Sequence, residues 1–211
     1  MVIIGENIYQ EMYLKVKRKN KLILGITGIR SEYDIMSSVF REIANHSNLD
    51  LRLIVTGAHL SEKYGLTIKE IRKDKFKISD EIESLLDSDT DSSRVIGLSI
   101  QVEAMTRAIK KIKPDILLVL GDREESLAVA IVGTYLSIPV AHISGGDKVV
   151  GNIDDHVRHS VTKLAHIHFP TSEDSKKRIL KDFNNQKTKN KPSEKKYELK
   201  GERSIALSWV G

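Results

Sequence analysis

The chain contains no cysteine among its 211 residues, which excludes disulfide bonds, thiolate nucleophiles and zinc sites built from cysteine. No apolar run approaches the roughly 18 residues that a membrane-spanning helix needs. The first twenty residues are also too polar to serve as a secretory signal. We therefore expect a cytoplasmic protein without a membrane partner, in which any bound metal would need histidine and carboxylate ligands.

Nucleotide-binding and nucleic-acid-binding motifs are also scarce. The segment GITG at 25–28 lacks the third glycine and the later acidic residue of a dinucleotide site, and no GxxxxGK[ST] loop is present. The net charge of +5 is concentrated in residues 1–20 and 181–211, and only 5% of the residues are aromatic. A near-neutral middle with so few rings for base stacking predicts no nucleic-acid partner.

Six strand-like runs alternate with helical segments along the middle of the chain. Strands are expected at 22–27, 50–57, 76–78, 116–120, 138–143 and 166–170, and helices at 35–44, 92–112, 126–136 and 153–165. This order predicts an α/β protein with a Rossmann-like doubly wound parallel sheet across residues 21–180. Residues 1–20 show no helical or strand-like period of apolar residues and are interpreted as an extension that precedes the domain. Residues 181–211, rich in lysine and asparagine, are expected to form a basic, poorly ordered tail.

The run of apolar residues at 116–120 is uninterrupted, which is typical of a strand covered on both faces. Gly121 ends the run, and Asp122 and Arg123 follow at the carboxyl end of the strand, where open α/β sheets place their ligands. Asp122 could act as a base or accept a hydroxyl, or it could cap the helix that begins near Glu124. The residues alone do not favour either of these alternatives.

Further acidic residues follow the strand at 138–143. In the segment SGGD at 144–147 the glycines would let backbone amides approach an anion, or they would form only an ordinary tight turn. Asp154 and Asp155 open the next helix, where Asp154 with Arg158 and Asp155 with His159 form i,i+4 pairs. One of the two aspartates is expected to cap the helix, so a structural explanation covers these residues as well.

Five of the seven histidines fall within 27 residues, from His142 to His168. Their spacing matches no HExxH helix and includes no placed carboxylate, so we predict no metal site. Uncharged imidazoles that bind hydroxyls or phosphates at a crevice fit the pattern better. Arg30 could pair with a phosphate or carboxylate, or it could be a solvated loop arginine, and its spacing favours the second reading.

Four separated segments, taken together, resemble one family. They are TGIRSEYD (27–34), TGAHLSEKYGLT (56–67), KPDILLVLGDREESLAVA (113–130) and IPVAHISGGDKVVGNIDDHVRHSVTKLAHIHF (138–169). The resemblance is to the hydrolysing UDP-N-acetylglucosamine 2-epimerases and covers about residues 21–180. It implies a glycosyltransferase-B type fold, in which two Rossmann-like halves hold the sugar nucleotide between them. This chain matches the amino-terminal half.

The resemblance also implies the reaction. A UDP-activated N-acetylhexosamine is converted to UDP and the free 2-epimeric sugar, N-acetylmannosamine or a related sugar, for the synthesis of sialic and other nonulosonic acids. Removal of the hydrogen at sugar carbon 2 while UDP leaves carbon 1 gives a glycal-type intermediate, to which water then adds. The implied substrate is a UDP-sugar, no metal or redox cofactor is required, and the full-length protein is expected to be a homo-oligomer.

By the same resemblance, Asp122, Asp154 and Asp147 match catalytic carboxylates. The positions that match substrate contacts are Arg30, His59, Arg123, His142, Gly145, Gly146 and His159. Family members often carry TGTRAEYG where this chain has TGIRSEYD. The chain also lacks the glutamate that members commonly carry at the position of Val150, and the acidic residue that some relatives carry at that of Ser144. Asp147 is then the carboxylate left in that loop.

Two rival interpretations remain: a non-catalytic remnant or interaction module of the same fold, and a glycosyltransferase of similar architecture. The 31 residues after Leu180 are too few to build a second domain, so we expect a truncated chain that is nearly inactive as given. The downstream coding sequence would separate the first rival from the epimerase. Consumption of an acceptor sugar would identify the second.

Overall fold

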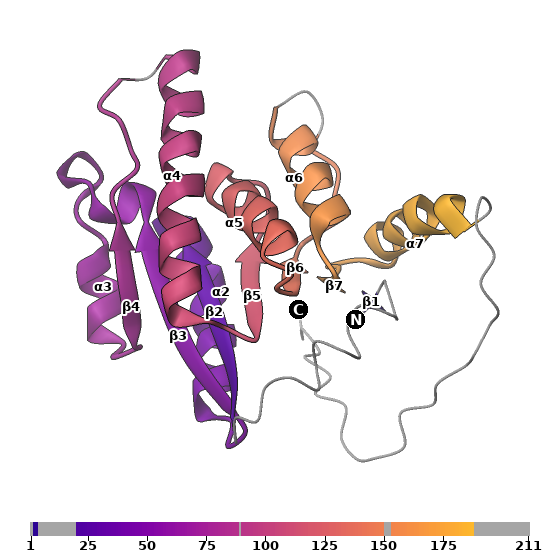
Figure 1. The fold of residues 1–211 in the computed structure, drawn as a ribbon, viewed down its shortest axis with the longest axis horizontal. Coiled ribbons are helices and arrows are strands. Elements are labelled where there is room, and N and C mark those ends of the chain that lie inside the picture. The colour runs from indigo at the N-terminus through magenta and orange to yellow at the C-terminus, as the bar shows by residue number, and fades with distance from the viewer. Residues whose placement is uncertain (1, 4–19, 89, 150–152, 188–211) are drawn as a thin grey trace.

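A computed structural model describes residues 2–3, 20–88, 90–149 and 153–187. Its centre is a seven-stranded sheet in the order β1-β7-β6-β5-β2-β3-β4 (Figure 1). The strands are β1 (Val2–Ile3), β2 (Lys21–Thr27), β3 (Leu49–Thr56), β4 (Ile78–Ile82), β5 (Ile116–Leu120), β6 (Val140–Ile143) and β7 (Ile167–Phe169). Strands β2 to β7 run parallel to their neighbours, and β1 is antiparallel to β7. The predicted doubly wound parallel sheet is confirmed.

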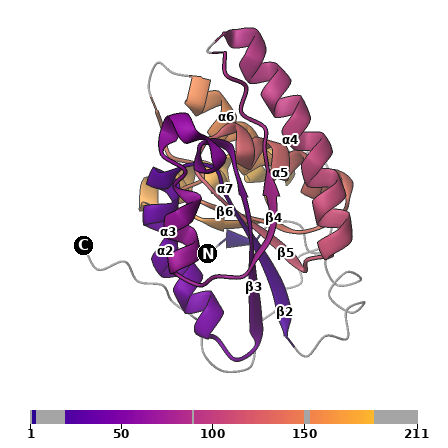
Figure 2. The same cartoon turned by 90° about the vertical axis from the view of Figure 1, so that its left-hand side faces the viewer.

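Helices cover both faces of the sheet (Figures 1 and 2). One face carries α2 (Arg30–Asn45) and α3 (Ile68–Lys73), and the other carries α4 (Asp91–Ile112), α5 (Glu124–Tyr135) and α6 (Ile153–Leu164). The 3-10 turns η1 (Gly57–Leu60) and η2 (Glu62–Tyr64) precede α3, and α7 (Glu173–Lys187) follows β7 beyond α6. None of the helices in the described ranges has both the length and the apolar character needed to cross a bilayer.

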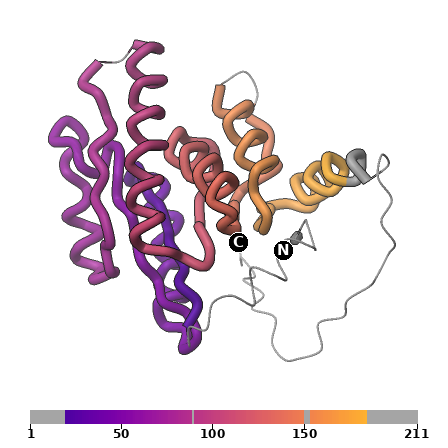
Figure 3. The backbone as a smooth tube through the Cα atoms, viewed as in Figure 1, coloured from indigo at the N-terminus to yellow at the C-terminus, as the bar shows by residue number. Residues whose placement is uncertain are grey.

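The order of the strands reverses at β2. After β4 the chain returns through α4 and places β5 on the other side of β2, a path that the tube in Figure 3 follows. Helices α2 and α5, which follow these two neighbouring strands, cover opposite faces of the sheet. The carboxyl ends of β2 and β5 therefore open a crevice, and the residues after the two strands meet there.

Each face of the sheet packs its own hydrophobic core, because side chains alternate between the faces along a strand. In β5, Leu117 and Val119 join the core under α4, α5 and α6, whereas Leu118 and Leu120 join the core under α2 and α3. Phe40 of α2 is fully buried in this second core. Burial on both faces explains why β5 is an uninterrupted apolar run.

Helix α2 begins at Arg30, five residues earlier than predicted. Residues 28–34 are mostly polar and lie outside the helix predicted at 35–44. In the structure Tyr33 is buried in the core, and its hydroxyl donates a hydrogen bond to Asp74. Tertiary packing of one ring thus overrides the local composition. Two smaller differences are α3, which was not predicted, and β4, which lies at 78–82 instead of 76–78.

Helix α7 crosses the predicted domain boundary at residue 180 and continues to Lys187. Ile179 is fully buried, and the ring centroid of Phe183 lies 5.6 Å from that of His168 on β7. These contacts explain why the first part of the predicted tail is helical, since amphipathic packing stabilises a short helix. Residues 188–211 of the predicted tail and 4–19 of the predicted extension lie outside the described residues, as does the departure at Val150.

Candidate active site

A cavity of about 430 Å³ lies where β2 and β5 end. Its charged lining comes from α2, α4, α5, α6 and the turn after β5, and consists of Glu32, Arg94, Asp122, Arg123, Glu124, Asp154 and Arg158. This is the edge of the sheet at which the sequence predicted the site. Guanidinium groups beside carboxyl groups can bind an anion and transfer protons in one place.

The turn after β5 places Asp122 in the cavity. Gly121 adopts φ +70°, a conformation that glycine takes at no steric cost, and α5 begins at Glu124. The N-cap residue of α5 is Arg123, so Asp122 does not cap the helix and that alternative is wrong. The Asp122 carboxylate forms an ion pair with Arg158, and the two side chains are 21% and 13% exposed.

Helix α6 presents charged residues on two neighbouring faces. Asp154 and Arg158, one turn apart, line the cavity. On the next face His159 Nε2 lies 3.5 Å from Asp155 Oδ1, which is the predicted i,i+4 pair. Asp155 also accepts a hydrogen bond of 2.8 Å from the Val149 N–H, and this bond lowers the pKa of Asp155. His159 therefore lies beside the cavity, outside its described lining.

Asp147 anchors the loop after β6. Its carboxylate accepts hydrogen bonds from the hydroxyls of Thr171 (2.8 and 2.9 Å) and Ser175, and it lies 3.5 Å from Arg158 Nη1. Arg158 thus lies between Asp122 and Asp147. Asp147, predicted as a catalytic carboxylate, is outside the described lining of the cavity and can orient the guanidinium group that contacts Asp122.

The two glycines of this loop are buried against α6 and α7. The Gly146 N–H donates to Thr162 Oγ1 (3.2 Å), and its carbonyl accepts from Arg178 Nε (2.6 Å). A Cβ on Gly145 would lie 2.8 Å from His142 Nδ1. The sequence left open whether these amides approach an anion or form an ordinary tight turn, and the Gly146 amide is bound within the protein. In this structure the glycines permit close packing of the loop.

Burial keeps His59 and His142 uncharged. Both residues are 0% exposed, and their burial lowers the pKa of each to about 4. His142 Nε2 donates to the Gly121 carbonyl, 2.7 Å away, and so holds the turn after β5. The ring of His59 lies between the hydroxyls of Thr27 (3.0 Å) and Thr67 (2.7 Å). The rings are neutral, as expected, but they contact protein groups behind the cavity wall instead of the cavity itself.

Arg30 is the first residue of α2, and its side chain is 66% exposed. Its Nε lies 3.6 Å from Asp34 Oδ2, one helical turn away. The next residue, Ser31, lines the cavity, whereas Arg30 is not among the lining residues. This position fits the prediction, favoured by the spacing, that Arg30 is a solvated arginine, although the residue lies on a helix instead of a loop.

Four charged residues of the lining were not assigned from the sequence: Glu32, Arg94, Glu124 and Arg158. Arg94 forms an ion pair with Glu124, and Arg158 pairs with Asp122. A signal existed for three of the four. Arg158 follows Asp154 by one helical turn, and Glu32 and Glu124 fall in the segments TGIRSEYD and KPDILLVLGDREESLAVA. Nothing in the local pattern indicated Arg94, because its approach depends on the packing of α4 against α5.

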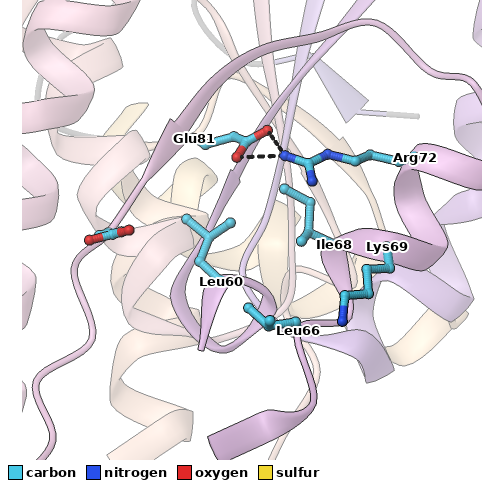
Figure 4. Close-up of a pocket in the computed structure, with 7 residues that line it drawn as sticks. Leu60, Leu66, Ile68, Lys69, Arg72 and Glu81 are labelled. Atoms are coloured by element: carbon cyan, nitrogen blue, oxygen red, sulfur yellow. Dashed lines mark hydrogen bonds and ion pairs between the residues drawn. The ribbon is translucent and has the colours of Figure 1, made fainter. Parts of the chain in front are cut away.

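A second cavity, of about 490 Å³, lies between α3 and the edge strand β4 (Figure 4). Leu60, Leu66 and Ile68 form its apolar part, and Arg72 pairs with Glu81 at 2.7 Å. The predicted site residues all lie elsewhere, so the cavity at β2 and β5 is the candidate site. Within the described residues, no group of three or more histidine or carboxylate side chains lies close enough together to hold a metal ion.

Sequence comparison identifies relatives of the chain. A family model described as UDP-N-acetylglucosamine 2-epimerase matches residues 41–188. The chain is 41% identical over 162 residues to a GDP/UDP-N,N'-diacetylbacillosamine 2-epimerase (hydrolyzing) of Campylobacter jejuni. It is 38% identical over 159 residues to a UDP-N,N'-diacetylbacillosamine 2-epimerase (hydrolyzing) of Legionella pneumophila. These matches cover 77% and 75% of this chain but 42% of each relative, so the chain spans less than half the length of these relatives.

Solved structures share the fold. The crystal structure of UDP-GlcNAc 2-epimerase from Neisseria meningitidis bound to UDP-GlcNAc matches with a TM-score of 0.65 at 23% identity, over 76% of this chain and 43% of that one. The structure of UDP-GlcNAc 2-epimerase from Methanocaldococcus jannaschii gives a TM-score of 0.63 at 22% identity, over 77% and 42%. The common part is a Rossmann-like domain of the glycosyltransferase-B type.

Proposed function

The chain belongs to the UDP-N-acetylglucosamine 2-epimerase family, and we propose that it supplies the carboxylate-bearing side of the active site of a hydrolysing 2-epimerase. The substrate is a UDP-activated 2-acetamido sugar, and the products are UDP and the free 2-epimeric sugar. The observation that carries the proposal is the ion pair of Asp122 with Arg158, in a cavity at the point where the strand order reverses.

Asp122 is the base of the first step. It takes the proton from sugar carbon 2 while the bond between carbon 1 and UDP breaks, which leaves a double bond between carbons 1 and 2. A base held within reach of the bound sugar contributes to the rate by position and by proton transfer. Arg94 and Arg123 place positive charge at the same cavity for the departing diphosphate. Asp154 on α6 adds a further carboxylate to the lining.

The buried residues around this group position it. His142 holds the Gly121 carbonyl immediately before Asp122, and Asp147 contacts the other side of the Arg158 guanidinium group. A contact to the group that holds a reacting side chain fixes the orientation of that side chain. We therefore assign His142 and Asp147 to positioning, and Asp122 and Arg158 to contact with the substrate.

The substituents of the sugar are the finer part of the proposal. The relatives at 41% and 38% identity are named for diacetylbacillosamine, and one from Neisseria meningitidis at 36% identity is named for N-acetylglucosamine. We favour UDP-N,N'-diacetylbacillosamine as the substrate, with UDP-N-acetylglucosamine and its product N-acetylmannosamine as the alternative. A comparison of kcat/KM for the two sugar nucleotides decides between them.

The test of the mechanism uses a full-length relative in which an aspartate aligns with Asp122. Replacing that aspartate by asparagine should slow UDP release by roughly 100-fold or more, the scale of acid–base catalysis. Binding of the UDP-sugar should persist, because the amide keeps the shape of the side chain. An exposed aspartate of the same relative, outside the cavity, is the control. Near-normal turnover in the asparagine variant would remove Asp122 from the mechanism.

A further inference from the structure

Glu32 is another carboxyl group of the cavity, on the wall formed by α2. Its Oε2 accepts a hydrogen bond of 3.4 Å from the Gly28 N–H. Its Oε1 is shut off from solvent and has no hydrogen-bond partner within the described part of the chain. An oxygen in this position is costly while the carboxylate is ionised, and a proton on the group removes that cost.

The carboxyl group of Glu125 is fixed beside Glu32. It lies in a cradle of two glycines, since a Cβ on Gly28 would be 2.4 Å from Glu125 Cδ and one on Gly57 would be 2.5 Å from its Oε1. Arg123 Nε lies 3.3 Å from Glu125 Oε2 and provides positive charge to the pair. The Arg123 guanidinium group thus contacts Glu125 directly, and its charge also acts on Glu32.

The surroundings of Glu32 favour its protonated form. Burial raises the pKa of Glu32 to about 8, with the negative charge of Glu125 as the second cause and that of Asp122 as a smaller one. Arg123 and the hydrogen bond from Gly28 act in the opposite direction. Glu32 is therefore a neutral acid at pH 7, and it ionises as the pH rises through about 8.

Two of the carboxyl groups at the cavity lie in different surroundings. Asp122 is paired with the Arg158 guanidinium group, whereas Glu32 lies beside the carboxyl group of Glu125, and burial together with that charge raises the pKa of Glu32. Two titratable groups whose environments separate them in this way are assigned as base and acid. We propose that Glu32 is the proton donor of this cavity and returns a proton to sugar carbon 2 after Asp122 has removed one. This inference rests on the proposed function.

The steps balance in protons and electrons. Asp122 takes the proton from carbon 2, the electrons of that bond form the double bond, and UDP leaves carbon 1 with its electron pair. Glu32 then gives its proton to carbon 2, and the oxygen of water bonds to carbon 1. The proton released by the water returns to Glu32, and Asp122 loses its proton to solvent. One water is consumed, and UDP, the free sugar and one proton are formed.

The first test measures the proton on Glu32 in this chain. Carbon-13 NMR follows labelled glutamate carboxyl groups against pH, and the Glu32 signal is the one missing from Glu32→Gln. We expect its midpoint near 8 in the wild-type chain and lower in Glu125→Gln, which removes the facing charge. Glu103→Gln, at an exposed pair with Arg107, is the matched control and should leave the midpoint unchanged. A Glu32 midpoint at the ordinary glutamate value overturns the inference.

The second test separates the acid from the base by their products, in a full-length relative with a glutamate aligned to Glu32. Its glutamine variant should still release UDP but accumulate the glycal, and should form the epimeric sugar at least about 100-fold more slowly. The asparagine variant at the position of Asp122 should release almost no UDP and accumulate no glycal. Epimeric sugar formed at the wild-type rate by the glutamine variant overturns the inference, as does loss of UDP release without glycal.

Failure of the proposed function has a different signature. In that case the full-length relative releases UDP at a near-normal rate in the asparagine variant at the position of Asp122, although Glu32 of this chain still titrates near 8. If that variant loses UDP release while the glutamine variant forms the epimeric sugar at the wild-type rate, the proposed function stands and the role of Glu32 is overturned.

Discussion

Replacing Gly146 by alanine tests whether the loop after β6 is built for packing. Gly146 has φ +76°, and an added Cβ would lie 2.7 Å from the Ser175 carbonyl oxygen and 2.8 Å from Ile179 Cγ1, both on α7. Gly65 is the matched control, because it has φ +83° and no described atom lies within 4 Å of an added Cβ. The two substitutions carry similar backbone strain, and only the first adds a clash.

The expected losses of stability follow from these distances. A left-handed backbone costs alanine about 1–2 kcal/mol, from which about 0.4–1 kcal/mol is offset because alanine restricts the unfolded chain. Gly65→Ala should therefore lower the free energy of unfolding by about 1 kcal/mol. Two contacts below 3 Å in a packed interior add an overpacking cost of about 1–3 kcal/mol, so Gly146→Ala should lower it by about 2–4 kcal/mol.

Urea unfolding followed by circular dichroism measures both losses against the wild-type chain, provided that the three transitions share one slope with denaturant. The difference between the variants isolates the packing of α7 on the loop. Equal losses for Gly146→Ala and Gly65→Ala would refute this reasoning.

Two further predictions concern pH and metal. Burial lowers the pKa of His59, His142 and His168 to about 4 each, so between about pH 6.5 and pH 4 the unfolded chain binds more protons than the folded one. The free energy of unfolding should therefore have its full value above about pH 6.5. As the pH falls below that value, it should decrease by at most about 1.4 kcal/mol per pH unit for each of these histidines. Urea midpoints between pH 7 and pH 5 test this, with His59→Asn expected to flatten the slope and the exposed His156→Asn to leave it unchanged; a constant wild-type midpoint would contradict it. UDP release by a full-length relative should be unaffected by EDTA, because the histidines lack ligand spacing, and activity lost to EDTA and restored by one divalent ion would show the opposite.

The sheet could be predicted from the sequence because its signal is local. A strand buried on both faces must be apolar throughout, so the run at 116–120 predicted β5 with the bounds that the structure has. The alternation of such runs with helices predicted parallel order, since a crossover helix is needed between parallel strands. Where tertiary contacts decide, the pattern failed. Tyr33 extends α2 by packing into the core, and Ile179 and Phe183 hold α7 past the predicted boundary.

The position of the site followed from the same local signals, because Asp122 and Arg123 directly follow β5 and the carboxyl ends of parallel strands share one edge. Which side chains meet at that edge is a property of the folded chain. Arg158 comes from α6, 36 residues after Asp122, and α2 brings Glu32 to a carboxyl group on α5. The sequence alone thus predicted the sheet and the edge at which the candidate site lies. Tertiary structure decided which carboxyl groups meet and that the pKa of Glu32 is raised, because that pKa depends on burial and on charges from distant segments, which no local period encodes.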